Sequence, residues 1–72
     1  MITLYTGDLC GFCTRAKMLL NEWNIPFKEA NITHNDQHRE FLKSHGHRSV
    51  PQIYRNGKLL VEGGYDGLRA LG

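Results

Sequence analysis

Long apolar runs are absent from this sequence. A run such as Met18–Leu20 reaches only three residues, whereas a membrane-spanning helix needs about 20. A cleaved signal peptide needs an uninterrupted apolar segment, but polar residues and a glycine interrupt the opening at Thr3, Thr6, Gly7 and Asp8. We therefore expect a soluble cytoplasmic protein that does not bind membranes.

Blocks of like charge, low-complexity segments and internal repeats are also absent. Nine Lys and Arg residues and seven Asp and Glu residues are interleaved along the chain, with a formal net charge of +2. This pattern lacks the basic patch of a nucleic-acid-binding protein. With 72 residues, the chain is long enough for one domain, residues 1–72. Nothing in the pattern indicates self-association, so we expect a monomer.

Cysteine is scarce, with only Cys10 and Cys13 present. A secreted disulfide scaffold usually has more cysteines at wider spacing, because a bridge across so short a loop removes little entropy from the unfolded chain. A single Cys-x-x-Cys pair is more typical of a redox or metal site. The pair is therefore the main candidate for function.

The first half of the chain predicts a strand followed by a helix and a second strand. Apolar and polar residues alternate over Ile2–Tyr5, which is typical of a strand. The following apolar residues have helical spacing, and Pro26 limits the helix. The predicted apolar stripe consists of Phe12, Ala16, Leu19, Leu20 and Trp23. Alternation over Phe27–Ile32 predicts the second strand.

The second half predicts a helix, a hairpin and a last helix. Thr33–Asp36 offers N-cap residues for a helix through about Lys43, and Gly46 suits its C-terminal cap. Asn56-Gly57 is a strong sequence signal for a hairpin turn. The remaining predicted elements are strands at Pro51–Arg55 and Lys58–Glu62 and a helix at Tyr65–Leu71. The order β-α-β-α-β-β-α indicates an α/β fold with a four-stranded mixed sheet flanked by helices.

The predicted position of the cysteines favours thiol chemistry. Cys10 lies where a helix begins, and the unpaired N–H groups and dipole at a helix N-terminus stabilise a thiolate. Cys13 lies one turn later on the same side, within reach of Cys10. Arg15 and Lys17 either add positive potential near the cysteines or point into solvent. The negative charge of Asp8 has the opposite effect on a thiolate.

A structural zinc site is the alternative interpretation of the cysteine pair. Two of the four histidines would complete its four ligands. The candidates are His34, His38, His45 and His47. A strand, a Cys-x-x-Cys pair and a helix in succession favour the redox interpretation, so we expect no metal and assign the histidines no mechanism.

Three ordered motifs resemble the dithiol glutaredoxins, which have a thioredoxin-like fold, and the resemblance covers nearly the whole chain. The first is Leu4-Tyr5-Thr6 leading into Cys10-Gly11-Phe12-Cys13 and the following helix. Ser49-Val50-Pro51-Gln52-Ile53-Tyr54 is similar to the family's Thr-Val-Pro-Gln-Ile-Phe segment. Gly63-Gly64-Tyr65-Asp66 is similar to its Gly-Gly-x-Asp segment.

The resemblance implies a glutathione site beside catalytic Cys10 and Cys13. It implies that Pro51 is a cis proline and that the main chain of Val50 pairs with the cysteinyl part of glutathione. It further implies that the γ-glutamyl end is held by Gly64, Tyr65 and Asp66, and that Arg48 faces the glycyl carboxylate. Gly67 stands where the family usually has a second aspartate.

The function implied by the resemblance is glutathione-dependent reduction of protein disulfides and glutathione mixed disulfides. Two alternatives remain open. One is a redoxin that donates electrons to ribonucleotide reductase and is recharged by thioredoxin reductase. It is favoured because Thr6-Gly7-Asp8 lacks the lysine that many glutaredoxins have there. The other is a dimer that binds a [2Fe–2S] cluster through Cys10 and glutathione.

Overall fold

The computed structural model describes residues 1–72 and confirms the predicted order of elements. These are β1 (Ile2–Thr6), α1 (Gly11–Glu22), β2 (Phe27–Asn31), α2 (Asp36–Ser44), β3 (Gln52–Arg55), β4 (Lys58–Leu59) and α3 (Gly64–Arg69). None of the three helices combines the length and apolar character that crossing a membrane requires.

The four strands form the expected mixed sheet in the order β2-β1-β3-β4. β1 runs parallel to β2, with Leu4 opposite Glu29. β1 is antiparallel to β3, with Leu4 opposite Ile53, and β3 is antiparallel to β4. Leu4 and Ile53 are both completely buried, so the strand that leads to Cys10 is anchored at the centre of the sheet.

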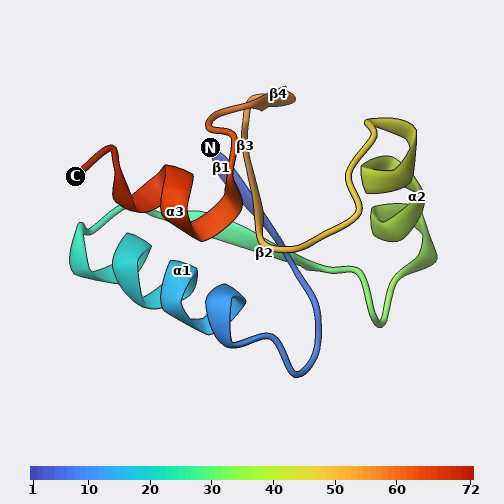
Figure 1. The fold of residues 1–72 in the computed structure, drawn as a ribbon, viewed down its shortest axis with the longest axis horizontal. Helices are drawn as coiled ribbons and strands as arrows, with labels where there is room; N and C mark the ends of the chain where they lie inside the picture. The colour runs from blue at the N-terminus through green and yellow to red at the C-terminus, as the bar shows by residue number, and fades with distance from the viewer.

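Helices cover both faces of the sheet, and each face has its own hydrophobic cluster. Figure 1 shows α1 and α3 on one side and α2 on the other. The first cluster is largely aliphatic and joins β1, β3, α1 and α3. The second is rich in aromatic residues: it contains Tyr5 and Tyr54, and Phe41 packs against it. The cysteines lie at the start of α1, a short loop after β1 ends, and α1 packs into the first cluster.

The predicted apolar stripe of α1 is wrong at Phe12. The buried residues of this helix are Cys13, Ala16 and Leu20, whereas the Phe12 side chain is 54% exposed. Cys13 takes the inward position at this end of the helix, one residue later than the stripe predicts. Phe12 consequently lies outside the core, with its ring centroid 6.0 Å from that of Tyr65.

The second strand of the hairpin is shorter than predicted. The Leu60 N–H donates to the Ile53 carbonyl oxygen over 2.9 Å, but β4 ends at Leu59. Residues 61–62 leave the sheet because the chain bends at Gly63, at φ 86°, into α3. The remaining helix and strand boundaries differ from the predicted ones by at most two residues.

Candidate active site

Cys10 and Cys13 form a disulfide across the first turn of α1, with their Cα atoms 5.2 Å apart. Cys10 is the N-cap of α1, and its sulfur accepts a hydrogen bond from the Cys13 N–H over 3.1 Å. Cys10 is half-buried, whereas Cys13 is only 2% exposed. In the reduced pair, the same N–H and the helix dipole favour a thiolate at the accessible Cys10. Cys13 is then placed to resolve a mixed disulfide.

A cleft of about 390 Å³ lies beside the disulfide. The carbonyl oxygen of Val50 is 3.8 Å from the Cys10 sulfur, and the Val50–Pro51 bond is cis, as the resemblance implies. We call this the backbone cleft, after the Val50–Pro51 backbone and the two glycines that take part in its lining. It is lined by Phe12, Ser49, Val50, Pro51, Gln52, Gly63, Gly64, Tyr65 and Asp66.

Five of the six residues predicted to bind glutathione therefore lie together in the backbone cleft. Arg48 does not line it. It lines a separate hollow of about 210 Å³ that also includes Arg39 and Lys43. The role of all six in glutathione binding stays a prediction.

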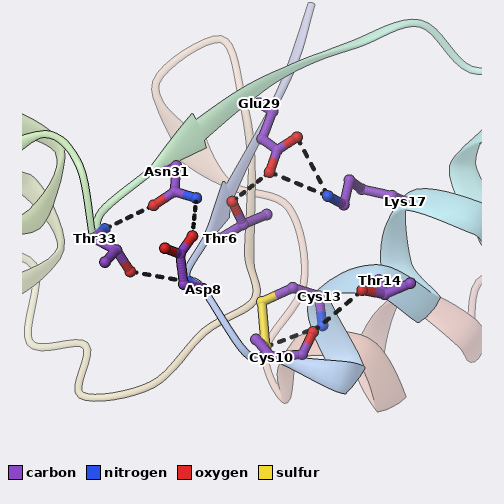
Figure 2. A network of polar contacts seen from close by, with 9 residues as sticks. All are labelled: Thr6, Asp8, Cys10, Cys13, Thr14, Lys17, Glu29, Asn31 and Thr33. Atoms are coloured by element: carbon purple, nitrogen blue, oxygen red, sulfur yellow. Dashed lines mark hydrogen bonds and ion pairs between the residues drawn. A yellow bond between two sulfur atoms is a disulfide. The ribbon is translucent and has the colours of Figure 1, made fainter.

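A second hollow, of about 380 Å³, adjoins the cysteines and shares no lining residue with the backbone cleft. We call it the charged hollow. It is lined by Gly7, Asp8, Leu9, Cys10, Gly11, Cys13, Thr14, Lys17, Glu29 and Asn31. Figure 2 shows its polar contacts around the disulfide.

Glu29 joins β1, β2 and α1 in the charged hollow. Its carboxylate accepts a hydrogen bond from the Thr6 hydroxyl over 2.7 Å and pairs with the Lys17 Nζ over 3.3 Å. The Thr6 hydrogen bond, with a further contribution from Lys17, lowers the pKa of Glu29. Thr6 and Glu29 are not predictable as site residues from the sequence, because 23 residues separate them and no local pattern links them.

Asp8 is held by side chains from the end of β2 and from the segment that follows it. Its carboxylate accepts a hydrogen bond from Asn31 over 3.0 Å and lies 2.7 Å from the His34 Nε2. The Asn31 hydrogen bond, followed by the hydrogen bond and charge of His34, lowers the pKa of Asp8. A negative charge therefore lies two residues before Cys10. Of the two basic side chains considered near the cysteines, Lys17 is paired with Glu29 and Arg15 is exposed over the Phe12 ring.

The histidines do not join the cysteines. His34 contacts Asp8, whereas His38, His45 and His47 lie against the aromatic residues of the second cluster. No group of three or more His, Cys, Asp or Glu side chains is arranged to hold a metal ion. This arrangement does not form the four-ligand zinc site considered as an alternative.

Comparisons with known proteins agree with this geometry. The family model for glutaredoxin matches residues 2–60. Glutaredoxin 3 of Escherichia coli K12 is 38% identical over 71 residues, which are 97% of this chain and 83% of that protein. A buckwheat glutaredoxin–glutathione complex matches with a TM-score of 0.78 at 22% identity, over 96% of this chain and 64% of that one. The E. coli NrdH-redoxin matches with a TM-score of 0.73 at 25% identity, over 76% of this chain and 72% of that one.

The thioredoxin-like sheet, the disulfide at the start of α1 and the match to the glutaredoxin family model together define a thiol–disulfide oxidoreductase. Within that class, the chain belongs to the glutaredoxin family.

Proposed function

We propose that this protein uses glutathione to reduce protein disulfides and glutathione mixed disulfides. The observation that carries the proposal is the position of the backbone cleft, whose Val50 carbonyl lies 3.8 Å from the Cys10 sulfur. A tripeptide thiol bound there would have its sulfur next to Cys10. The glutathione bound by the buckwheat glutaredoxin of the same fold supports this assignment.

The reaction consists of thiol–disulfide exchanges. The Cys10 thiolate attacks one sulfur of the substrate disulfide, forms a mixed disulfide and releases the other sulfur as a thiolate, which takes a proton from water. The Cys13 thiolate then attacks Cys10 and releases the second substrate thiolate. Two electrons have passed to the substrate, and the Cys10–Cys13 disulfide is formed.

Two molecules of glutathione restore the dithiol. The first glutathione thiolate attacks Cys10, which forms a mixed disulfide and releases the Cys13 thiolate. The second attacks the glutathione sulfur of that mixed disulfide, which releases the Cys10 thiolate and glutathione disulfide. The Cys13 N–H that faces the Cys10 sulfur stabilises the Cys10 thiolate in both halves of the cycle, first as the nucleophile and later as the leaving group.

The cleft residues have distinct proposed roles. The Val50 main chain pairs with the cysteinyl part of glutathione beside Pro51, and Gly64, Tyr65 and Asp66 hold the γ-glutamyl end. Arg48 is proposed to face the glycyl carboxylate from the neighbouring hollow.

The test is glutathione-coupled reduction of the mixed disulfide between glutathione and hydroxyethyl thiol. Wild type is compared with Cys10→Ser and Cys13→Ser. We expect Cys10→Ser to lose all activity. Cys13→Ser should retain activity, because glutathione can itself resolve the mixed disulfide at Cys10. Full activity in Cys10→Ser would contradict the proposal.

A second candidate function is a redoxin recharged by thioredoxin reductase. The segment Thr6-Gly7-Asp8, which carries an acidic residue and no lysine near Cys10, favours it, as does the structural likeness to the E. coli NrdH-redoxin. The same assay with thioredoxin reductase in place of glutathione separates the two. Activity with the reductase alone would assign the protein to this second function and remove the glutathione roles of the cleft residues.

We propose that the protein is a monomer in the cytoplasm, where the reducing environment returns a Cys-x-x-Cys pair to its dithiol form. Ribonucleotide reductase is a proposed protein substrate under either function. Reduction of its disulfide by the purified protein, with each electron source in turn, tests this partner.

A further inference from the structure

Leu9 combines two features that do not stabilise the fold. Its side chain is 106% exposed relative to the reference state, and it belongs to neither hydrophobic cluster. Its backbone is left-handed, at φ 55°, a conformation that side chains with a Cβ disfavour. The chain's two other non-glycine residues in this region are Asn24 and Asn56, and asparagine tolerates it well. A leucine here is therefore unfavourable for the free protein.

The position of Leu9 suggests what the leucine does. Single exposed apolar residues are ordinary on protein surfaces, and Met18 and Leu71 are examples here. Leu9, however, directly precedes Cys10. Phe12, which is 54% exposed, lies two residues after Cys10. Two exposed apolar residues thus flank Cys10 in the sequence, and Leu9 lines the same hollow as Cys10.

Leu9 is also separate from the proposed glutathione cleft. It lines the charged hollow together with Cys10, and no residue of that hollow lines the backbone cleft. A ligand confined to the backbone cleft leaves Leu9 in water. A polypeptide that extends to both sides of Cys10 would cover it.

We infer that Leu9, with Phe12, is a docking contact for protein disulfide substrates that carry an apolar side chain next to the reactive half-cystine. Burial of that side chain against Leu9 removes apolar surface from water. The contact selects peptide disulfides by the residue beside their cysteine. The inference rests on disulfide exchange at Cys10 and is independent of whether glutathione or thioredoxin reductase restores the dithiol.

The exchange itself follows the steps given above. The Cys10 thiolate forms a mixed disulfide with one peptide and releases the other as a thiolate. Cys13 then releases the first peptide, and the protein leaves as the oxidised form with two electrons transferred to the probe.

The test uses protein reduced beforehand, in a single turnover, with two synthetic probes. Each probe is a pair of identical decapeptides joined by one disulfide, with either Leu or Ser on each side of the cysteine. The measured quantity is the ratio of second-order rate constants for the two probes, which cancels any general change in Cys10 reactivity. We expect wild type to prefer the Leu probe by roughly tenfold, about the effect of burying part of one leucine.

Leu9→Asn should bring that ratio down to about two, because Phe12 remains. Asparagine suits the backbone at this position, so the fold should be retained. Met18→Asn, which removes an equally apolar exposed side chain from α1, should leave the ratio at the wild-type value. A ratio in Leu9→Asn equal to that of wild type would overturn the inference.

A second copy of this chain is the competing occupant, and sedimentation velocity of the reduced protein tests it. We expect wild type and Leu9→Asn to sediment alike. A dimer that Leu9→Asn abolishes would assign Leu9 to self-association and also overturn the inference. Because the assay contains no glutathione, a failure of the glutathione proposal would leave these outcomes unchanged.

Discussion

The two hollows beside the cysteines are built in different ways. In the backbone cleft, the main chain of Val50–Pro51 meets the glycine-rich start of α3. In the charged hollow, side chains from β1, β2 and α1 form ion pairs and hydrogen bonds, with Glu29 between Thr6 and Lys17. The shape of the backbone cleft depends on whether a Cβ atom fits at its glycines, whereas the contacts in the charged hollow depend on charge. Steric changes should therefore affect the cleft, and pH should affect the hollow.

The largest effect is expected from Gly67→Ala. A Cβ on Gly67 would overlap the backbone carbonyl oxygen of Glu62, and backbone atoms cannot move aside as a flexible side chain can. We expect α3 to be displaced and the free energy of unfolding to fall by at least about 2 kcal/mol, as measured by urea denaturation.

Gly11→Ala is the matched control, because a Cβ there meets nothing within 4 Å. Its free energy of unfolding should not fall and should rise by at most about 1 kcal/mol, because Gly11 lies in α1 and alanine is the better helix former. Equal stability of the Gly67→Ala and wild-type proteins would show that α3 is not held against the chain before it.

Gly64→Ala should affect the cleft itself. The added Cβ would lie 2.9 Å from the Pro51 carbonyl oxygen, and Gly64 has φ +59°. We expect a loss of about 1–2 kcal/mol of stability from the left-handed backbone. We also expect about a tenfold lower kcat/KM for glutathione, equivalent to about 1.4 kcal/mol, because Pro51 must shift.

Gly46→Ala separates the two effects. Gly46 has φ +81°, but a Cβ there meets nothing within 4 Å. It should lose similar stability while its kcat/KM for glutathione stays at the wild-type value. Equal kinetic losses in both variants would contradict a specific role for the cleft wall.

Glu29→Gln should alter the pH dependence of stability. The folded-state pKa of Glu29 is lowered, chiefly by the Thr6 hydrogen bond. Its ionised form therefore stabilises the protein above the ordinary glutamate pKa of about 4.3, and this contribution is lost as pH falls through the lower folded-state pKa. We expect Glu29→Gln to be less stable than wild type at pH 7 and to differ less from it at pH 3.

Urea denaturation at both pH values measures this difference. Glu22→Gln is the control, because Glu22 is exposed and takes part in none of the chain's ion pairs. A stability difference between Glu29→Gln and wild type that is the same at pH 3 and pH 7 would contradict the role of the charge.

The smallest effect is expected from Leu9→Asn, at the one strained side chain of the charged hollow. Asparagine tolerates the φ of 55° better than leucine does, so the free energy of unfolding should rise by about 0.5–1 kcal/mol. The reverse exchange, Asn24→Leu at φ 57°, should lower it by a similar amount. A stabilising Asn24→Leu, measured by thermal and urea denaturation, would show that leucine is not disfavoured in this conformation.

Short-range features of the fold were predictable because neighbouring residues determine them. The alternation at β1 and β2, the Asn56-Gly57 turn and the Cys10–Cys13 spacing all operate within a few residues, and each is found in the structure. Phe12 shows the limit of this approach. Its spacing fits the apolar stripe of α1, yet Cys13 packs inward and Phe12 stays exposed.

The structure gives a steric reason for the glycine at position 67. In the sequence, it is a glycine where the family usually has an aspartate. In the structure, the Glu62 carbonyl lies where its Cβ would be. No pattern near Gly67 predicts this contact, because it depends on how the hairpin returns to α3.

The sequence by itself determined the order of elements, the mixed sheet and the redox pair, since periodicity, turn residues and caps are local properties of the chain. Only the tertiary structure decided that Arg48 lies outside the cleft, that Glu29 pairs with Thr6 and Lys17, and that Leu9 is fully exposed. These features depend on how the elements pack. Packing brings together residues distant in the chain, and spacing along the sequence does not specify which of them will meet.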